Sequence, residues 1–145
     1  MRDEVIANEA TVGMPKLREA LEASWDAATA YGGVSEAGNP ALGQCYPTSR
    51  VVQHFYPEVE IVEGDVWTGK SVETHFWNVL IADGNEYHID MTWQQFSPGS
   101  AVRSFRVRDR ETLGDSSPTI ERCNLLRDRV VSYLATRSQS LNGQT

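Results

Sequence analysis

The chain has 145 residues, of which 40% are hydrophobic, and its 13 basic and 20 acidic side chains give a formal net charge of −7. This length fits one domain with a hydrophobic core of its own. The excess of acidic groups argues against a nucleic-acid partner, because such binding depends on neutralising phosphates, and no apolar run reaches the roughly 18 residues that a membrane span needs.

The cysteines and the N-terminus bear on the compartment. Cys45 and Cys123 are too few and too far apart for the disulfide framework of a small secreted protein. Residues 1–4 lack the basic-then-apolar layout of a signal peptide. We therefore expect reduced thiols and a cytoplasmic protein.

Two helices are predicted in the first part of the chain. Leucine and tryptophan recur every four residues behind Pro15, which predicts a helix over 15–25. A loop rich in glycine, serine, alanine and asparagine follows. Pro47 suits the first turn of a second helix, which we expect over 47–55.

The middle of the chain has the pattern of a small sheet. A strand over 59–66 is expected to be broken at Gly64, and an almost wholly apolar strand covers 74–82. The Asp-Gly pair at 83–84 is typical of a two-residue hairpin loop, so residues 85–92 form the return strand.

The last part combines a charged segment with a helix. Four arginines between 103 and 110 stand beside acidic residues, which favours a solvated mixed-charge segment over an anion-binding patch. Ser117 and Pro118 open a final helix with an apolar stripe that runs to Leu134. We expect the polar tail to fray after Thr136.

Together these elements predict an α+β fold. N-terminal helices pack on a small, mainly antiparallel sheet, and a C-terminal helix closes the structure. A single domain spans residues 1–136, with its core at about 15–134. Residues 137–145 are expected to be a polar, disordered tail.

Cys45 is the first candidate functional residue. It is predicted at the N-terminal edge of the second helix, reached through Gly43. Unpaired backbone N–H groups and the positive end of the helix dipole favour a thiolate there, and the same N–H groups can hold an oxyanion. A buried cysteine without a chemical role is the alternative.

The hairpin places a base and a carboxylate on one face. If the loop has two residues, Ala82 faces Asn85, and counting back along both strands puts His75 opposite Thr92. Asp90 then lies diagonally from His75, within reach of its ring. A register shift of one residue would instead move Asp90 to the opposite face.

These residues form a candidate triad of nucleophile, base and orienting group: Cys45, His75 and Asp90. Gln44 could donate to an oxyanion, or it could be a loop glutamine bonded to the backbone. Asn78 lies in an apolar strand and needs partners if it is buried, so we expect it to orient the hairpin or the cleft.

Other candidates have simpler interpretations. His54 falls near a helix C-terminus, where a histidine commonly lies close to the last carbonyls. His88 could replace His75 as the base, although its position in mid-strand favours a structural role. Cys123 lies on the apolar stripe of the last helix. Because no short paired spacing of ligand residues occurs, we expect no metal and no cofactor.

The order Cys, His, Asp resembles that of papain-like cysteine hydrolases and of the compact cell-wall peptidases with that fold. At a finer level the chain is similar to the YunG-like proteins, a small family of uncharacterised bacterial proteins. The resemblance covers about residues 25–134 and implies a papain-like domain with a candidate triad, but no substrate. The matching segments are 39–45, 51–53, 75–78 and 90–96, with Trp25, Thr119, Arg122, Leu125, Leu126, Arg129 and Val130.

The sequence therefore predicts a cysteine-dependent hydrolase or acyl transferase that acts on a peptide, an isopeptide or a side-chain amide. The alternative is a non-catalytic binding or adaptor module on the same scaffold. A redox role is weaker, because Cys45 has no resolving cysteine nearby in the sequence. The expected partner is an amide-containing substrate or another protein, and the oligomeric state stays open.

Overall fold

The computed structural model describes residues 12–143 of the chain, and side chains as far as residue 137. Residues 1–11 and 144–145 lie outside the described part. The prediction of a cytoplasmic protein rests partly on the first of these ranges. The described elements are, in chain order, α2 (Met14–Ser24), η1 (Tyr31–Gly33), α3 (Cys45–Phe55), β1 (Glu60–Trp67), β2 (Val72–Ala82), β3 (Asn85–Ile89), η2 (Trp93–Gln95), β4 (Ala101–Arg108), η3 (Arg110–Thr112) and α4 (Ser117–Gly143).

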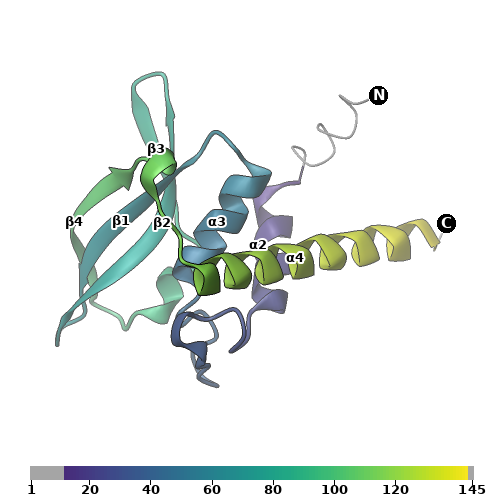
Figure 1. Cartoon of the computed structure of the whole chain (residues 1–145), viewed down its shortest axis with the longest axis horizontal. Coiled ribbons are helices and arrows are strands. Elements are labelled where there is room, and N and C mark those ends of the chain that lie inside the picture. Colours follow the sequence, from purple (N-terminus) through teal and green to yellow (C-terminus); the bar gives the residue numbers. More distant parts are fainter. Residues whose placement is uncertain (1–11, 144–145) are drawn as a thin grey trace.

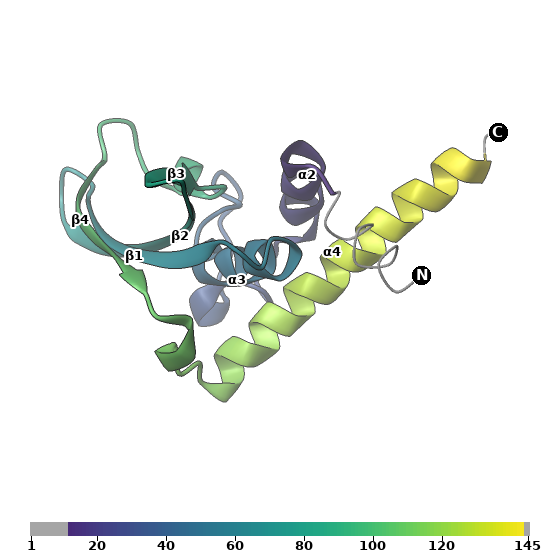
Figure 2. The same ribbon diagram turned by 90° about the horizontal axis from the view of Figure 1, so that it is seen from above.

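The strands form one antiparallel sheet in the order β3-β2-β1-β4. This sheet curls into a trough, and the three α-helices lie together beside it (Figures 1 and 2). α3 packs on β1 and β2, and α4 packs against both α2 and α3. The predicted α+β fold, with helices on a small antiparallel sheet and a closing C-terminal helix, is confirmed.

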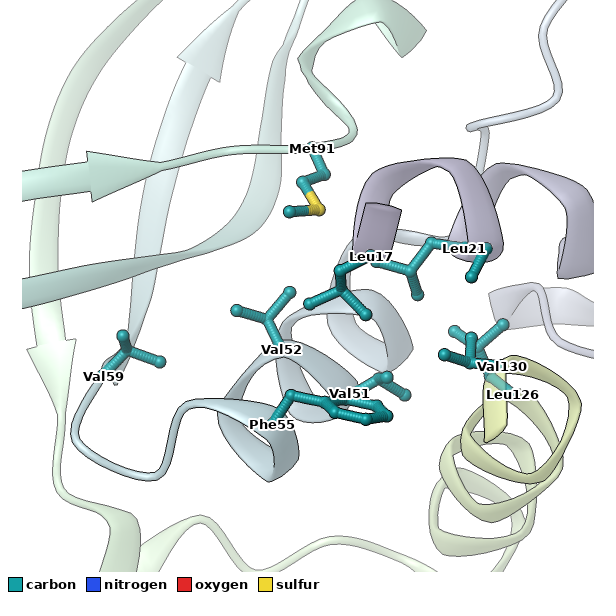
Figure 3. Packing of buried hydrophobic residues seen from close by; sticks show 10 residues of the cluster. Leu17, Leu21, Val51, Val52, Phe55, Val59, Met91, Leu126 and Val130 are labelled. Carbon is teal, nitrogen blue, oxygen red and sulfur yellow. The ribbon is translucent and has the colours of Figure 1, made fainter. Parts of the chain in front are cut away.

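One hydrophobic core joins the helices to the sheet. Side chains of α3 lie at its centre and point toward those of α2 and α4 (Figure 3). Burying one leucine or valine side chain contributes about 1.5–3 kcal/mol to the stability of the folded state. The buried members are Leu17, Ala20, Leu21, Val51, Val52, Phe55, Val59, Met91, Leu126 and Val130.

Buried amide side chains fix α3 relative to the sheet. Nδ2 of Asn78, in β2, donates to the backbone oxygens of Ser49 (3.1 Å) and Glu60 (3.4 Å). Nε2 of Gln53 donates to the backbone oxygen of Val59 at 3.0 Å. Because a buried amide left without partners is costly, these bonds favour one position of α3 on β1 and β2.

Two strand boundaries differ from the prediction. β1 runs through Gly64 without a break, because Trp77 of the neighbouring strand fills the space above that residue. The return strand β3 ends at Ile89, earlier than the expected residue 92. It ends there because the carboxylate of Asp90 accepts a hydrogen bond from the backbone N–H of Thr92, which closes a local turn.

The expected mixed-charge segment is an edge strand, β4. Its arginines reach across to acidic side chains of β1. Arg106 and Arg108 bond to Glu63 at 3.1 and 2.5 Å, and Arg110 bonds to Glu60 at 3.2 Å. Three of the four arginines are therefore paired with acidic side chains of β1, and Arg103 lies over the ring of Trp67 instead.

The C-terminal helix α4 continues to Gly143, past residue 136, after which we expected the polar tail to begin. Arg137 donates to Glu19 of α2 at 3.3 Å, and the hydroxyl of Tyr133 donates to the same carboxylate. These contacts hold the later turns of α4 beside α2. No helix of the described chain is both long and apolar enough to cross a membrane.

We expect Gly64→Ala to destabilise the fold. The added Cβ would lie 2.4 Å from Cη2 of Trp77 and 3.1 Å from the backbone oxygen of Ser104, so the indole or the strands must shift. Such overpacking costs roughly 1–3 kcal/mol, which urea unfolding monitored by tryptophan fluorescence measures.

Gly38→Ala is the matched control, because its added Cβ meets no atom within 4 Å. It should leave the free energy of unfolding nearly unchanged or slightly higher. Equal stability of the two variants would contradict the close packing of Trp77 on Gly64.

Candidate functional site

Cys45 is the first residue of α3, as predicted, and its side chain is half-buried. Gly43 brings the chain to it with a φ of +77°, where a Cβ would lie 3.1 Å from the backbone oxygen of Tyr31 and 3.2 Å from Cβ of Ala30. The backbone oxygen of Gly43 accepts from the N–H of Tyr31 at 2.8 Å. Glycine is required here both for its conformation and for this close approach.

The first turn of α3 offers backbone donors. Within the described residues, the N–H groups of Cys45 and Tyr46 have no hydrogen-bond acceptor, and Pro47 has no N–H. Free donors at a helix start, together with the helix dipole, favour negative charge at that point. A thiolate or a developing oxyanion next to Cys45 would be stabilised there.

His75 and Asp90 are in direct contact. Nε2 of His75 lies 2.7 Å from Oδ2 of Asp90, and the imidazole is fully buried. The other carboxylate oxygen, Oδ1, accepts from the backbone N–H of Thr92 at 3.1 Å and from its hydroxyl at 3.4 Å. Asp90 is thus held on both oxygens and fixes the orientation of the ring.

The hairpin register produces this contact as the sequence predicts. Asp83 and Gly84 form the two-residue loop with φ values of 55° and 78°, and Ala82 pairs with Asn85. The ladder runs to the pair of Asn78 with Ile89, and Asp90 follows directly. Such positive φ angles are those of a type I′ turn.

The protonation of His75 depends on its neighbours. Burial of the ring lowers the pKa of His75, but Asp90 and the Cys45 thiol outweigh this effect and raise the pKa to about 9. Nε2 is taken by Asp90, so Nδ1 is the ring atom left for the thiol. Nδ1 is buried and has no hydrogen-bond partner among the described residues. At neutral pH the ring is an imidazolium beside Cys45.

Aromatic side chains enclose His75. The ring centroids of Phe96, Trp77 and Trp93 lie 4.8, 5.4 and 5.9 Å from that of the imidazole. Trp93 and Phe96 were not among the predicted site residues, although both closely follow Asp90 in the sequence. Because they exclude water, they strengthen the interaction between the imidazolium and its carboxylate.

A cavity of about 490 Å³ opens in front of Cys45. Its walls are largely apolar and aromatic, and His75 lies behind them without surface of its own. The thiol is therefore the member of the group that a bound molecule meets first. The lining residues are Tyr31, Leu42, Gly43, Cys45, Tyr46, Thr74, Phe76 and Gln95.

The side chain of Gln44 bonds to the loop before η1. Its Nε2 donates to the backbone oxygen of Asp26 at 2.9 Å, and its Oε1 accepts from the hydroxyl of Thr29 at 2.8 Å. The residue is almost fully buried. These contacts match the alternative of a backbone-bonded loop glutamine. Asn78, described above, orients α3 on the sheet.

The remaining histidines and the second cysteine lie apart from this group. His54 is exposed near the end of α3, and Nδ1 of His88 accepts from Nε1 of Trp77 at 2.9 Å. Burial raises the pKa of the Cys123 thiol to about 11. Residues 12–143 contain no cluster of three or more ligand side chains that would suit a metal ion.

A thiol at a cavity thus lies near a buried imidazole that is bonded to a carboxylate, all within one α+β domain. The family model described as YunG protein matches residues 14–135, which is most of the chain. The chain therefore belongs to the YunG family. Neither the curated proteins nor the solved structures contain a match to it.

Asp90→Asn should lower the pKa of His75 well below its value of about 9, because the carboxylate no longer opposes burial and only Cys45 still does. An NMR titration of the ring signals measures this, since the chain has only 3 histidines. Glu86→Gln, which removes a carboxylate 3.2 Å from His88, is the control and should leave the His75 signal unchanged.

The raised pKa of His75 also predicts how the free energy of unfolding of the wild type depends on pH. A histidine pKa that is raised on folding means that the folded state binds more protons between pH 6.5 and about 9. The stabilising contribution is complete below pH 6.5 and is lost as the pH rises through 9; its size is on the order of 3 kcal/mol.

Urea unfolding at several pH values across this window measures the loss. Asp90→Asn should remove much of the pH dependence, because the substitution removes the carboxylate that raises the pKa of His75. A wild-type protein as stable at the alkaline end as at the acidic end would contradict the raised pKa of His75.

Proposed function

We propose that the protein is a cysteine-dependent hydrolase or acyl transferase with a papain-like arrangement of Cys45, His75 and Asp90. The observation that carries this proposal is the buried His75, bonded to Asp90 through Nε2 and close enough to Cys45 for that residue to raise the pKa of the ring. An imidazolium so held stabilises a thiolate beside it, and the thiolate is the nucleophilic form of cysteine.

The first step forms an acyl-enzyme. The Sγ of Cys45 attacks the carbonyl carbon of an amide, and the carbonyl oxygen becomes an oxyanion near the free N–H groups of Cys45 and Tyr46. The C–N bond then breaks, and His75 gives the proton on Nδ1 to the departing nitrogen. A thioester to Cys45 and a free amine result.

The second step releases the acyl group. Water, or another nucleophile in an acyl transfer, attacks the thioester carbon while Nδ1 of His75 accepts its proton. The C–S bond breaks, which returns the thiolate and gives a carboxylic acid or a transferred acyl group. Throughout both steps Asp90 keeps the ring in place, because both of its oxygens are engaged.

The cavity supports an amide or peptide substrate with apolar parts. Its aromatic and aliphatic walls suit a side chain or linker that lies beside the scissile bond. Because Cys45 faces this space and His75 does not, the substrate must enter on the thiol side. The proposed reaction needs no group other than this chain's own residues and water.

The test compares thiol reactivity and acylation. We expect Cys45 to react with iodoacetamide at neutral pH roughly tenfold faster than free cysteine, of which only about a few per cent is thiolate. p-Nitrophenyl acetate should give a burst of nitrophenol and a hydroxylamine-sensitive acetyl group on Cys45, located by mass spectrometry of the digested protein.

Variants separate a triad from a merely exposed thiol. Asp90→Asn and His75→Gln should each slow alkylation and acylation of Cys45, whereas His54→Gln should not, because His54 is exposed near the end of α3. Circular dichroism checks that each variant is folded. A thiol no more reactive than free cysteine in the folded wild type would favour a non-catalytic binding module instead.

A further inference from the structure

A second cavity adjoins the one at Cys45, and the mechanism above does not use it. It has a volume of about 350 Å³ and shares three walls with the first, formed by Tyr31, Tyr46 and Phe76. Its far side is lined by Asp115 and by Arg122 of α4. The two cavities therefore lie next to each other.

Most charges around this second cavity are neutralised by the protein. Asp115 accepts from the hydroxyl of Tyr46 at 2.5 Å and from Nε of Arg50 at 3.1 Å. Arg108 is paired with Glu63 at 2.5 Å. Asp115 and Arg108 are therefore already paired within the protein and do not require a charged ligand.

Arg122 is the exception. Its Nη2 donates to the hydroxyl of Thr119 at 3.0 Å, and its guanidinium lies 5.5 Å from the ring centroid of Tyr31. Nε of Arg122 is buried without a hydrogen-bond partner, and the arginine makes no ion pair with a carboxylate of the described residues. An unpaired cation with an unsatisfied donor is unfavourable, and an added anion would relieve it.

We propose that this second cavity binds a carboxylate of the substrate through Arg122, so that Cys45 acts on amides carrying a carboxylate near the scissile bond. This rests on the proposed function for the role of Cys45. The planar guanidinium matches a carboxylate with two parallel hydrogen bonds. The chain has a formal net charge of −7, which repels anions. An unpaired arginine therefore gives this cavity a preference for anions that the rest of the surface lacks.

The experiment uses thiol reagents that differ only in charge. Maleimido-alkanoic acids of increasing chain length are compared with their primary amides, and labelling of Cys45 is followed by mass spectrometry. We expect the acid of suitable length to react roughly five- to tenfold faster than its amide at low ionic strength, since a charge-assisted bond forms at Arg122. Added salt should reduce the difference.

Variants assign the preference to one residue. Arg122→Gln should bring the acid-to-amide ratio to about one, and Arg122→Lys should retain part of it. Arg127→Gln is the matched control, because Arg127 is also on α4 but pairs with Asp128 at 3.2 Å outside both cavities. The ratio cancels any general change in thiol reactivity, and thermal unfolding verifies the fold.

A second set of probes identifies the source of the carboxylate. N-maleoyl-glutamine carries a main-chain carboxylate, N-maleoyl-isoglutamine carries a side-chain carboxylate, and the diamide is neutral. Faster labelling by the first indicates a chain terminus, and faster labelling by the second an acidic side chain; either result supports the proposal.

Equal labelling rates for acid and amide at every chain length would overturn the proposal that Arg122 binds a carboxylate. An acid-to-amide ratio in Arg122→Gln equal to that of the wild type would also overturn it. The two proposals fail separately. If Cys45 reacts with the neutral amide no faster than free cysteine does, the hydrolase proposal is contradicted. The acid-to-amide ratio would still measure binding at Arg122.

Discussion

The hydrogen-bonded pair of His75 and Asp90 is the interaction on which the candidate site depends. An imidazolium without exposed surface would be strongly unfavourable alone, because burial removes the water that stabilises its charge. The carboxylate 2.7 Å away compensates for that loss, and it is itself fixed by Thr92. The pair therefore serves folding and chemistry together: the contact that makes the buried charge tolerable also leaves Nδ1 without another partner among the described residues.

The rest of the fold brings the thiol to this pair. α3 carries Cys45 at its first residue and is held on the sheet by the amides of Asn78 and Gln53. The same helix lies at the centre of the hydrophobic core, so its position depends on packing from α2 and α4 as well (Figure 3). Local chain geometry at Gly43 then sets the approach to Cys45. The site is thus assembled from elements far apart in sequence but rigidly packed.

The sequence predicts those features of the structure that depend on residues close together in the chain, and it misses those that depend on distant ones. The contact of His75 with Asp90 follows from a two-residue hairpin loop, and the start of α3 follows from Pro47, so both are decided over a few residues. β4 could not be foreseen, because its arginines are explained by Glu63, some 40 positions earlier in the chain. Gly64 was misjudged as a break for a similar reason: its neighbour in space, Trp77, belongs to another strand. Likewise, the length of α4 depends on Glu19 of α2.

The complete burial of His75 has a kinetic consequence. No atom of the ring touches bulk water, and aromatic rings stand on several sides of it. When no substrate is bound, a proton can reach or leave this imidazole only through Cys45, through Asp90, or through a local opening of the hairpin. In the free protein, exchange of this proton with solvent therefore follows local openings of the fold.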